Sequence, residues 1–398
     1  MTTSIDNIFA AVPLENNPYP TAFPFTAREA AQSFAYPEPG DDTYRCEVIG
    51  IGHFQKEGLV REQSTGRTWR LTADEGKYLR GTDMAPAPLM HWGAGLHADA
   101  VLRIAALARE RGLELRKLNV VVRQGFASKG SFVKGEAVGL VFGLSWQVSI
   151  DAAGALDAAH QVVKDALAAS PAVDAMLTPR EGLFALYVNG ARSSISGLQE
   201  STSTERDPLT VYFGGLEPTG EGAWPTILTR RPGTGSTGMV LENDSTTSVG
   251  WHMHAEGELD LATGLVHSTV GFPEAAASSR WTLVSDGQGL VAPTPLAYFS
   301  IGTAFCYHTQ FCRYIDVRRL ALGPTTLVQS SRFALVDDSG RLAGQAASFD
   351  THVFLNGEID EETASALPLV AANTCSAHRA MDTAIEMNVA ETVVHTAS

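Results

Sequence analysis

Two stretches of this sequence repeat each other, reading APAPLMHWGAGLHAD over residues 85–99 and APTPLAYFSIGTAFC over residues 292–306. Each has prolines at its start and then apolar and small residues at helical spacing. A chain that contains one unit twice tends to keep the scaffold residues in both copies. At one constant offset the aligned pairs are Pro88 and Pro295, Gly95 and Gly302, and Asp99 and Cys306.

The last of these pairs changes its chemistry between the copies, because Asp99 aligns with Cys306. A free cysteine is often buried as a small apolar residue, and reactivity usually decides whether it matters. A cysteine that occurs in only one copy is therefore a candidate for function rather than for packing.

Composition limits the class of protein. The chain has 398 residues, which favours two domains. Hydrophobic residues make up 44% and charged residues 18%, as in soluble globular proteins. The net charge of −15 argues against nucleic acid or an anionic membrane as a partner, because phosphates are bound by basic patches.

The sequence shows no sign of secretion or membrane insertion. The first residues lack a charged segment followed by an apolar one, so we expect no signal peptide. No apolar stretch approaches the roughly 18 residues that span a bilayer. Four cysteines in a chain of this length do not form a disulfide scaffold, so we expect a cytoplasmic protein. They are Cys46, Cys306, Cys312 and Cys375.

The first copy is predicted to contain strands and two helices, with a polar turn at KEGLVREQSTG, residues 56–66. The predicted strands are Tyr44–Gly52, Thr68–Ala73, Leu118–Arg123 and Ala137–Ile150, and the predicted helices are Pro86–Arg111 and Leu156–Ala169.

The second copy follows the same order, and RWTLVS at residues 280–285 matches TWRLTA at residues 68–73. Aligning Met176 with Met381 places Ser170 opposite Cys375. The predicted strands are Ser248–Asp260, Arg280–Ser285, Thr325–Val336 and Ala346–Leu355, and the predicted helices are Pro293–Ile315 and Asp360–Ala372.

These patterns divide the chain into four segments. Residues 1–40 are predicted to form an irregular arm rich in proline and aromatic residues, and residues 41–176 to form the first copy. Residues 177–243, rich in Gly, Pro, Ser and Thr, are interpreted as a linker that contains one or two strands. Residues 244–398 form the second copy, which carries Cys306 and Cys375.

The pattern resembles the OsmC/Ohr family of thiol-dependent peroxidases. In that family a helix opens with a proline, carries small residues and delivers a cysteine roughly three turns further on. A second cysteine lies at the end of the following helix. Pro295, Gly302 and Cys306 match the first element, and Cys375 in NTCSAHRAM matches the second.

The resemblance implies an α+β fold in which antiparallel three-stranded sheets wrap around long central helices in an intertwined dimer. Active sites of the family lie at the dimer interface. Two OsmC-like copies in one chain would then form an intramolecular pseudo-dimer, and whether such chains assemble further stays open.

Two departures from the family pattern concern the site. Family peroxidases carry a glutamate just after the helix-opening proline, where this chain has Leu296 and Ala297. They also place an arginine on the loop of the early strands, whereas the second copy has no arginine between Arg231 and Arg280. The first copy, with Asp99 and Ser170 in place of cysteines, is expected to be inactive in redox chemistry or to have another use.

Cys306 needs a neighbouring cation or base, because the thiolate is the reactive form and an ordinary thiol is mostly protonated at neutral pH. His308 is near in sequence, although residues two apart on a helix point to different faces. Other candidates are His252 and His254, which share one face of a strand, and His378, Arg230 and Arg231. Asp99 could act as an acid or base beside Cys306, or could simply pair with Arg103 on its own helix.

Three functions follow from these residues. The first is a peroxidase that reduces organic hydroperoxides, in which Cys306 becomes a sulfenic acid and Cys375 resolves it to a disulfide. An external dithiol would then reduce the pair. The second is a cysteine hydrolase or transferase that uses Cys306 with a histidine or Asp99. The third is a protein that binds a small apolar ligand. We expect a small organic substrate, no cofactor and no bound metal.

Overall fold

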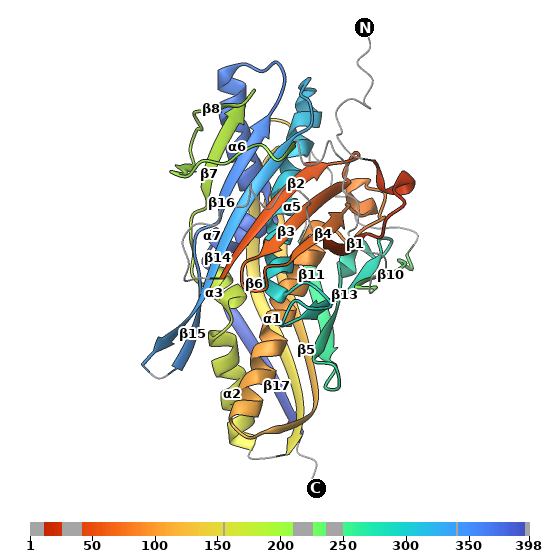
Figure 1. Cartoon of the computed structure of the whole chain (residues 1–398), viewed down its shortest axis with the longest axis vertical. Coiled ribbons are helices and arrows are strands. Elements are labelled where there is room, and N and C mark those ends of the chain that lie inside the picture. The colour runs from red at the N-terminus through yellow and green to blue at the C-terminus, as the bar shows by residue number, and fades with distance from the viewer. Residues whose placement is uncertain are drawn as a thin grey trace.

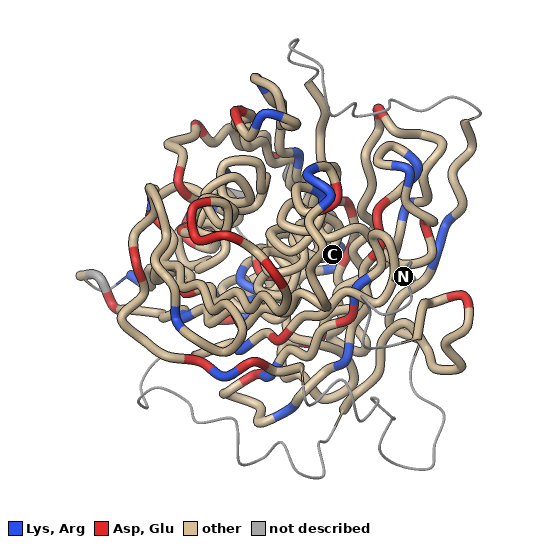
Figure 2. Tube along the Cα trace, turned by 90° about the horizontal axis from the view of Figure 1, so that it is seen from above, with Lys and Arg blue, Asp and Glu red and all other residues tan. Residues whose placement is uncertain are grey.

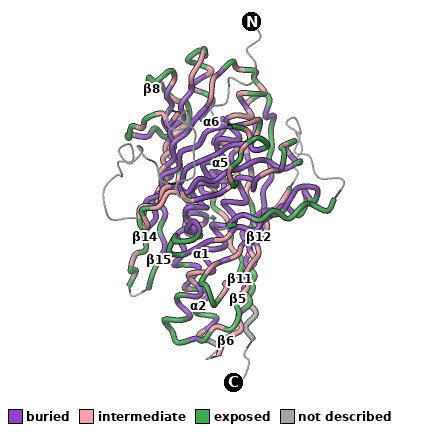
Figure 3. Tube along the Cα trace, turned by 45° about the vertical axis from the view of Figure 1, so that its right-hand side comes forward, coloured by how far each residue is buried: buried purple, intermediate pink, exposed green. Residues whose placement is uncertain are grey.

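The computed structural model describes residues 12–25, 42–153, 156–209, 226–235, 250–339 and 341–394. The fold is α+β: two sheets enclose a central pair of long helices (Figure 1). These helices are α1 (Pro88–Glu110) and α5 (Pro295–Arg318), and each begins with a proline at its first position. Both are mostly buried, as the purple trace of α5 in Figure 3 shows.

The repeated glycines allow the two central helices to touch. A Cβ atom on Gly95 would lie 2.4 Å from the backbone nitrogen of Phe299, and one on Gly302 would lie 2.3 Å from that of Trp92. The Trp92 and Phe299 rings stack beside this contact with centroids 5.4 Å apart. Gly95 meets Phe299 and Pro295, whereas Gly302, further along α5, meets Trp92, which comes earlier on α1. The two helices therefore run in opposite directions through the contact.

The first sheet, called sheet A, packs on α5 through β2, β3 and β14. Its strands follow the order β1-β4-β3-β2-β14-β16-β7-β8. Their bounds are β1 Ala22–Phe25, β4 Thr68–Ala73, β3 Lys56–Glu62, β2 Asp42–Gly50, β14 Thr326–Asp338, β16 Asp350–Leu355, β7 Leu183–Val188 and β8 Ala191–Ser193. Two further strands join its edges: β15 (Arg341–Ala346) pairs with β14, and β9 (Gln199–Glu200) pairs with β7.

The second sheet, called sheet B, packs on α1 through β5, β11 and β12. Its order is β10-β13-β12-β11-β5-β6-β17. The bounds are β10 Leu228–Arg231, β13 Arg280–Asp286, β12 Leu265–Gly271, β11 Trp251–Leu259, β5 Glu114–Lys129, β6 Val138–Ala153 and β17 Met387–Val394.

Each sheet takes strands from both halves of the sequence. Strand β2 from the first half pairs antiparallel with β14 from the second, and β11 from the second half pairs antiparallel with β5 from the first. The last strand of each half also crosses over, because β7 pairs in parallel with β16 and β17 pairs in parallel with β6. Val60 lies opposite Trp69 in sheet A as Val270 lies opposite Trp281 in sheet B.

Shorter helices complete the layers. In the first half α2 (Leu156–Ala168) and α3 (Pro171–Leu177) follow β6, and in the second half α6 (Glu361–Thr374) and α7 (Ser376–Asp382) follow β16. Asp360 caps α6 by accepting a hydrogen bond from the Thr363 amide, and Ser170 caps α3 through the Val173 amide.

The polar turn predicted over residues 56–66 is wrong for most of that stretch, because residues 56–62 form β3. Lys56, Glu57 and Glu62 of this strand are buried, and the Arg70 guanidinium of β4 lies 2.6 Å from the Glu57 carboxylate. A prediction based on polarity assigns such a segment to an exposed turn, because it assumes that charged residues are exposed, whereas paired charges can be buried in a strand.

The structure also adds strands that the sequence did not indicate clearly. Within the arm over residues 1–40, expected to be irregular, Ala22–Phe25 forms β1 on the edge of sheet A. The segment interpreted as a linker contains β7, β8, β9 and β10, and the strand predicted over Ala346–Leu355 is divided between β15 and β16. Strand β12 was not predicted.

Acidic and basic residues are interspersed along the trace (Figure 2). Among the described residues, no helix combines the length and the apolar character needed to cross a membrane.

Candidate active site

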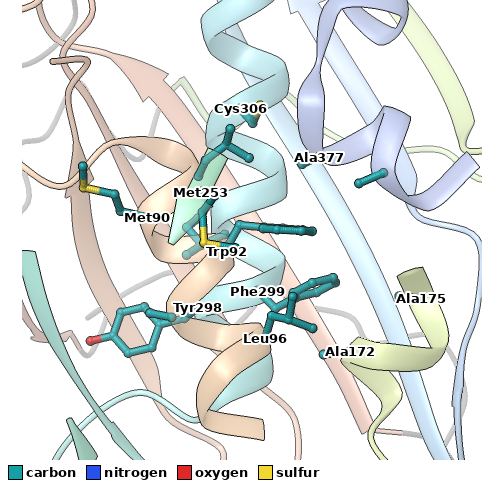
Figure 4. Close-up of a cluster of buried hydrophobic side chains, with 14 of the residues drawn as sticks. Met90, Trp92, Leu96, Ala172, Ala175, Met253, Tyr298, Phe299, Cys306 and Ala377 are labelled. Atoms are coloured by element: carbon teal, nitrogen blue, oxygen red, sulfur yellow. The ribbon is translucent and has the colours of Figure 1, made fainter. Parts of the chain in front are cut away.

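The two cysteines expected to react together are in contact. Cys306 lies on α5 with 4% of its surface exposed, and Cys375 lies fully buried at the junction between α6 and α7. The two thiols share a hydrogen bond, and both are free. Burial, together with this contact, raises the pKa of the Cys375 thiol well above its ordinary value. Figure 4 shows Cys306 at the upper end of the apolar cluster around Trp92.

The aligned residues of the first half make the corresponding contact with different chemistry. The Ser170 hydroxyl donates to the Asp99 carboxylate at 2.5 Å, and Asp99 also lies 3.5 Å from the Arg103 guanidinium. Since α1 and α5 run in opposite directions, Asp99 and Cys306 lie on opposite sides of the helix contact. Asp99 is therefore the partner of Ser170 and does not sit beside Cys306 as the sequence analysis considered.

A carboxylate reaches the Cys306 side from the first half. Glu75 follows β4 and is 5% exposed. One of its oxygens accepts a hydrogen bond from the Thr309 hydroxyl at 3.0 Å, and the other accepts one from the Tyr78 hydroxyl at 2.6 Å. Thr309 lies one turn after Cys306 on α5, so the second half holds Glu75 in place through a hydroxyl next to the cysteine.

Two cations lie within electrostatic reach of Cys306, and one comes from each half. Arg313 of α5 is stacked over the Phe132 ring at 4.4 Å and donates to Gln310 at 2.5 Å. Burial lowers the pKa of Arg313 to about 10 against the opposing attraction of Glu75 and Cys306, so its guanidinium stays charged at neutral pH.

Lys56 of β3 is the second cation, with 1% of its surface exposed. Its ammonium donates to the Phe54 carbonyl at 2.6 Å. Burial lowers the pKa of Lys56, and the attraction of Glu75, Asp74 and the thiols of Cys312 and Cys306 opposes that shift. Basic residues from both halves therefore lie near Cys306.

His308 makes contacts that join α5 to a neighbouring strand. Its Nε2 atom bonds the Thr325 carbonyl at 3.0 Å, and its Nδ1 lies 3.6 Å from the sulfur of Cys312. Burial lowers the pKa of His308 to about 4. Its ring therefore bridges α5 to the start of β14 and does not face Cys306.

His252 and His254 lie on the opposite face of β11 from the buried Met253, so they point away from the helices. The Nδ1 atom of His252 lies 2.7 Å from Glu274, and His254 lies 3.7 Å from Glu256. The structure does not bring these two histidines to Cys306, which corrects that expectation.

A different histidine does reach the cysteine pair. His378 on α7 places its Nδ1 atom 3.3 Å from the sulfur of Cys375. The ring of His378 packs against Phe184 and Tyr307, and it lines a cavity of about 200 Å³. Burial lowers the pKa of His378 to about 4, so the imidazole is neutral at pH 7.

Sequence reasoning missed most of the charged residues of this site. Arg313 follows Cys306 by seven residues, and a search for cations two helical turns away would have found it. Glu75 and Lys56 come from the other half, so no spacing in the sequence indicates them. In the described ranges no cluster of three or more His, Cys, Asp or Glu side chains is placed to hold a metal ion.

Comparison with known proteins gives little further guidance. No protein-family profile matches the chain, and no curated protein matches it. An OsmC-like hydroperoxide resistance protein from Jannaschia sp. CCS1, known from a crystal structure, is 18% identical over 32% of this chain and 80% of its own length. The TM-score of that alignment is 0.20, which is too low to support an argument about function.

Proposed function

We propose that the protein is a thiol peroxidase that reduces organic hydroperoxides through Cys306 and Cys375. We also propose that residues 41–176 and 244–398 are two OsmC-like copies that form an intramolecular pseudo-dimer. The reciprocal strand pairing of β2 with β14 and of β11 with β5 supports the duplication. So does the mutual contact of Gly95 and Gly302 with the opposite helix.

The observation that carries the activity is the contact between the two thiols in charged surroundings that both halves supply. A resolving cysteine must approach within disulfide distance of the cysteine that is oxidised, and these thiols already touch. Arg313 supplies positive charge near Cys306 from α5 itself, Lys56 lies near it on β3, and Glu75 accepts a hydrogen bond from Thr309 one turn after Cys306.

The reaction follows from these positions. The Cys306 thiolate attacks the distal oxygen of the hydroperoxide, the O–O bond breaks, and an alkoxide leaves and takes up a proton as the alcohol. The Arg313 guanidinium stabilises the departing oxyanion, since positive charge in a buried site stabilises developing negative charge. Cys375 then attacks the sulfenic acid, water leaves, and a disulfide forms. An external dithiol reduces the disulfide and becomes oxidised itself.

The arrangement supports the peroxidase better than a hydrolase. A cysteine hydrolase needs a base beside its nucleophile. His308 is bonded to Thr325, His252 and His254 face away from α5, and His378 contacts Cys375. In the Ohr-like pattern a glutamate and an arginine assist the cysteine. In this chain Glu75 and Arg313 would assist Cys306, although they lie at other sequence positions than the glutamate and arginine of that pattern.

The test is steady-state reduction of an organic hydroperoxide, such as cumene hydroperoxide, with a small dithiol as reductant. Cys306→Ser should abolish turnover, because no other thiol occupies its place. Without the dithiol, Cys375→Ser should consume about one equivalent of hydroperoxide and remain as a sulfenic acid. Cys46→Ser is the matched control, since Cys46 is fully buried in β2 and should not affect turnover. Full activity in Cys306→Ser would refute the proposal.

A further inference from the structure

The contact between His378 and Cys375 has a geometry suited to proton transfer. The Nδ1 atom lies 3.3 Å from the sulfur, and 5% of the residue is exposed. Phe184 from β7 and Tyr307 from α5 hold the ring with centroid distances of 5.6 and 5.1 Å. The other ring nitrogen, Nε2, is buried without a hydrogen-bond partner in the described part of the chain.

Before the reaction, the pair consists of a protonated thiol and a neutral imidazole. Burial keeps the Cys375 thiol protonated and the His378 imidazole neutral at pH 7. A neutral imidazole has one unprotonated nitrogen, and Nδ1 is the atom that faces the thiol. Cys375 must lose its proton before it can attack another sulfur, because the thiolate is the nucleophile.

Charged side chains around His378 form ion pairs with one another. On α7, Arg379 pairs with Asp382 at 2.6 Å, and beside the cavity Arg180 pairs with Asp174 at 2.9 Å. Glu181 lines the same cavity. Among the described residues none of these charged groups hydrogen-bonds the imidazole, so His378 is the group placed to accept the proton of Cys375.

Resting on the proposed function, we propose that His378 is the catalytic base of the resolving step. As Cys375 attacks the sulfenic sulfur of Cys306, its thiol proton passes to Nδ1 of His378. The new S–S bond forms as the S–O bond breaks, and the departing hydroxide takes up a proton to leave as water. His378 returns its proton to solvent through the cavity that it lines, so the step consumes no further reactant.

The first half is consistent with this role. The alignment that places Ser170 opposite Cys375 places Val173 opposite His378. The half without a thiol pair therefore also lacks the imidazole. There the Ser170 hydroxyl donates to Asp99 and accepts from the Val173 amide.

The experiment separates the two chemical steps in a single turnover with one equivalent of hydroperoxide. His378→Gln is compared with wild type and with His308→Gln, a buried histidine on α5 that the structure places away from Cys306. Hydroperoxide loss reports the first step. Trapping with dimedone reports the sulfenic acid, and thiol counting reports the disulfide.

In His378→Gln we expect hydroperoxide loss at nearly the wild-type rate and disulfide formation slower by about 100-fold, the usual contribution of a general base. The sulfenic acid should accumulate and be trapped. The remaining rate of disulfide formation should rise steeply with pH, as direct ionisation of Cys375 replaces transfer to the imidazole. His308→Gln should form the disulfide at the wild-type rate.

Disulfide formation at the wild-type rate in folded His378→Gln would overturn the assignment while leaving the peroxidase intact. Failure of the wild-type protein to consume hydroperoxide would instead overturn the proposed function. If His378→Gln does not fold, the wild-type protein in D2O still gives an answer. A resolving step limited by proton transfer should slow, and an unchanged rate would contradict it.

Discussion

At the scale of single residues, the two halves place different chemistry at aligned positions. Cys306 contacts Cys375 in one half, and Asp99 accepts a hydrogen bond from Ser170 in the other. Both contacts join a central helix to the start of a short helix, α7 or α3. The contact is thus a feature of the scaffold, and the sulfur atoms are what one half adds to it.

The charge of Arg313 should matter for the reaction with hydroperoxide. We expect Arg313→Gln to lower kcat/KM for the hydroperoxide by about 100-fold, because a buried cation near the reacting sulfur is lost. Steady-state kinetics with excess dithiol measures this effect. Arg103→Gln is the matched control, since Arg103 pairs with Asp99 in the other half and should change kcat/KM by less than about twofold. Equal losses in both variants would contradict the role of Arg313.

His308 should act on stability and not on turnover. Burial lowers the pKa of His308 to about 4 from 6.5, so the folded protein binds this proton more weakly than the unfolded chain. Its contribution to stability is present above about pH 6.5 and is lost as the pH falls toward 4. The free energy of unfolding of wild type minus that of His308→Gln should therefore fall across this range, by about 2 to 3 kcal/mol.

Urea unfolding at several pH values measures this difference, and hydroperoxide turnover in His308→Gln should stay near wild type. A large loss of turnover in a stable His308→Gln protein would contradict a purely structural role and indicate that His308 takes part in catalysis.

At the scale of elements, the contact between α1 and α5 fixes the fold. Gly95 and Gly302 let the two backbones approach closely, and the Trp92 and Phe299 rings fill the space beside them. Both glycines lie in helix interiors, where glycine is otherwise unfavourable. Close packing against the opposite backbone is the physical reason for glycine at both positions.

Gly95→Ala should destabilise the fold by about 2 kcal/mol or more, because its Cβ would overlap the Phe299 backbone at 2.4 Å. Urea unfolding measures the change. Gly250→Ala is the control, since a Cβ there would meet its nearest atom, in the Phe142 ring, at 3.6 Å. Equal stability of Gly95→Ala and wild type would show that the helices do not meet closely at this point.

The sequence predicted the long helices well, because proline starts and helical spacing are local signals. The helix predicted over Pro86–Arg111 is α1, and TWRLTA over residues 68–73 is β4. Prediction from the sequence failed where contacts between distant residues determine the structure. Strand β3 buries Glu57 in an ion pair with Arg70 of the neighbouring strand β4. Strand β1 forms by pairing with the edge of β4.

The site was predictable in part for the same reason. The pairing of Cys306 with Cys375 followed from the resemblance to the OsmC/Ohr pattern, and the two thiols interact in the structure. Glu75 and Lys56 come from the opposite half, and the role of His378 depends on the turn between α6 and α7. The positions of Glu75 and Lys56 cannot be derived from spacing within one copy, whereas His378 follows Cys375 by only three residues.

At the scale of the whole molecule, the halves are interleaved rather than placed side by side. Each sheet contains strands from both halves, and the surroundings of Cys306 contain Lys56 and Glu75 from one half and Arg313 from the other. A site built in this way exists only when both halves are folded together.

Separating the halves should therefore abolish folding. Residues 1–225 and 226–398, expressed alone, should each lack a cooperative unfolding transition, because each would leave the edges of β2 or β11 and one face of a central helix exposed. Co-expression should restore a one-to-one complex that size-exclusion chromatography detects. Cooperative unfolding of either half alone would contradict the interleaved fold.

The most direct test of the account maps the disulfide that forms when the reduced protein receives one equivalent of organic hydroperoxide. Free thiols are blocked, the protein is digested without reduction, and the linked peptides are identified by mass spectrometry. The account predicts loss of two thiols and one linked pair, Cys306 with Cys375, while Cys46 and Cys312 stay alkylated. No loss of thiols, or a disulfide that omits Cys306, would contradict it.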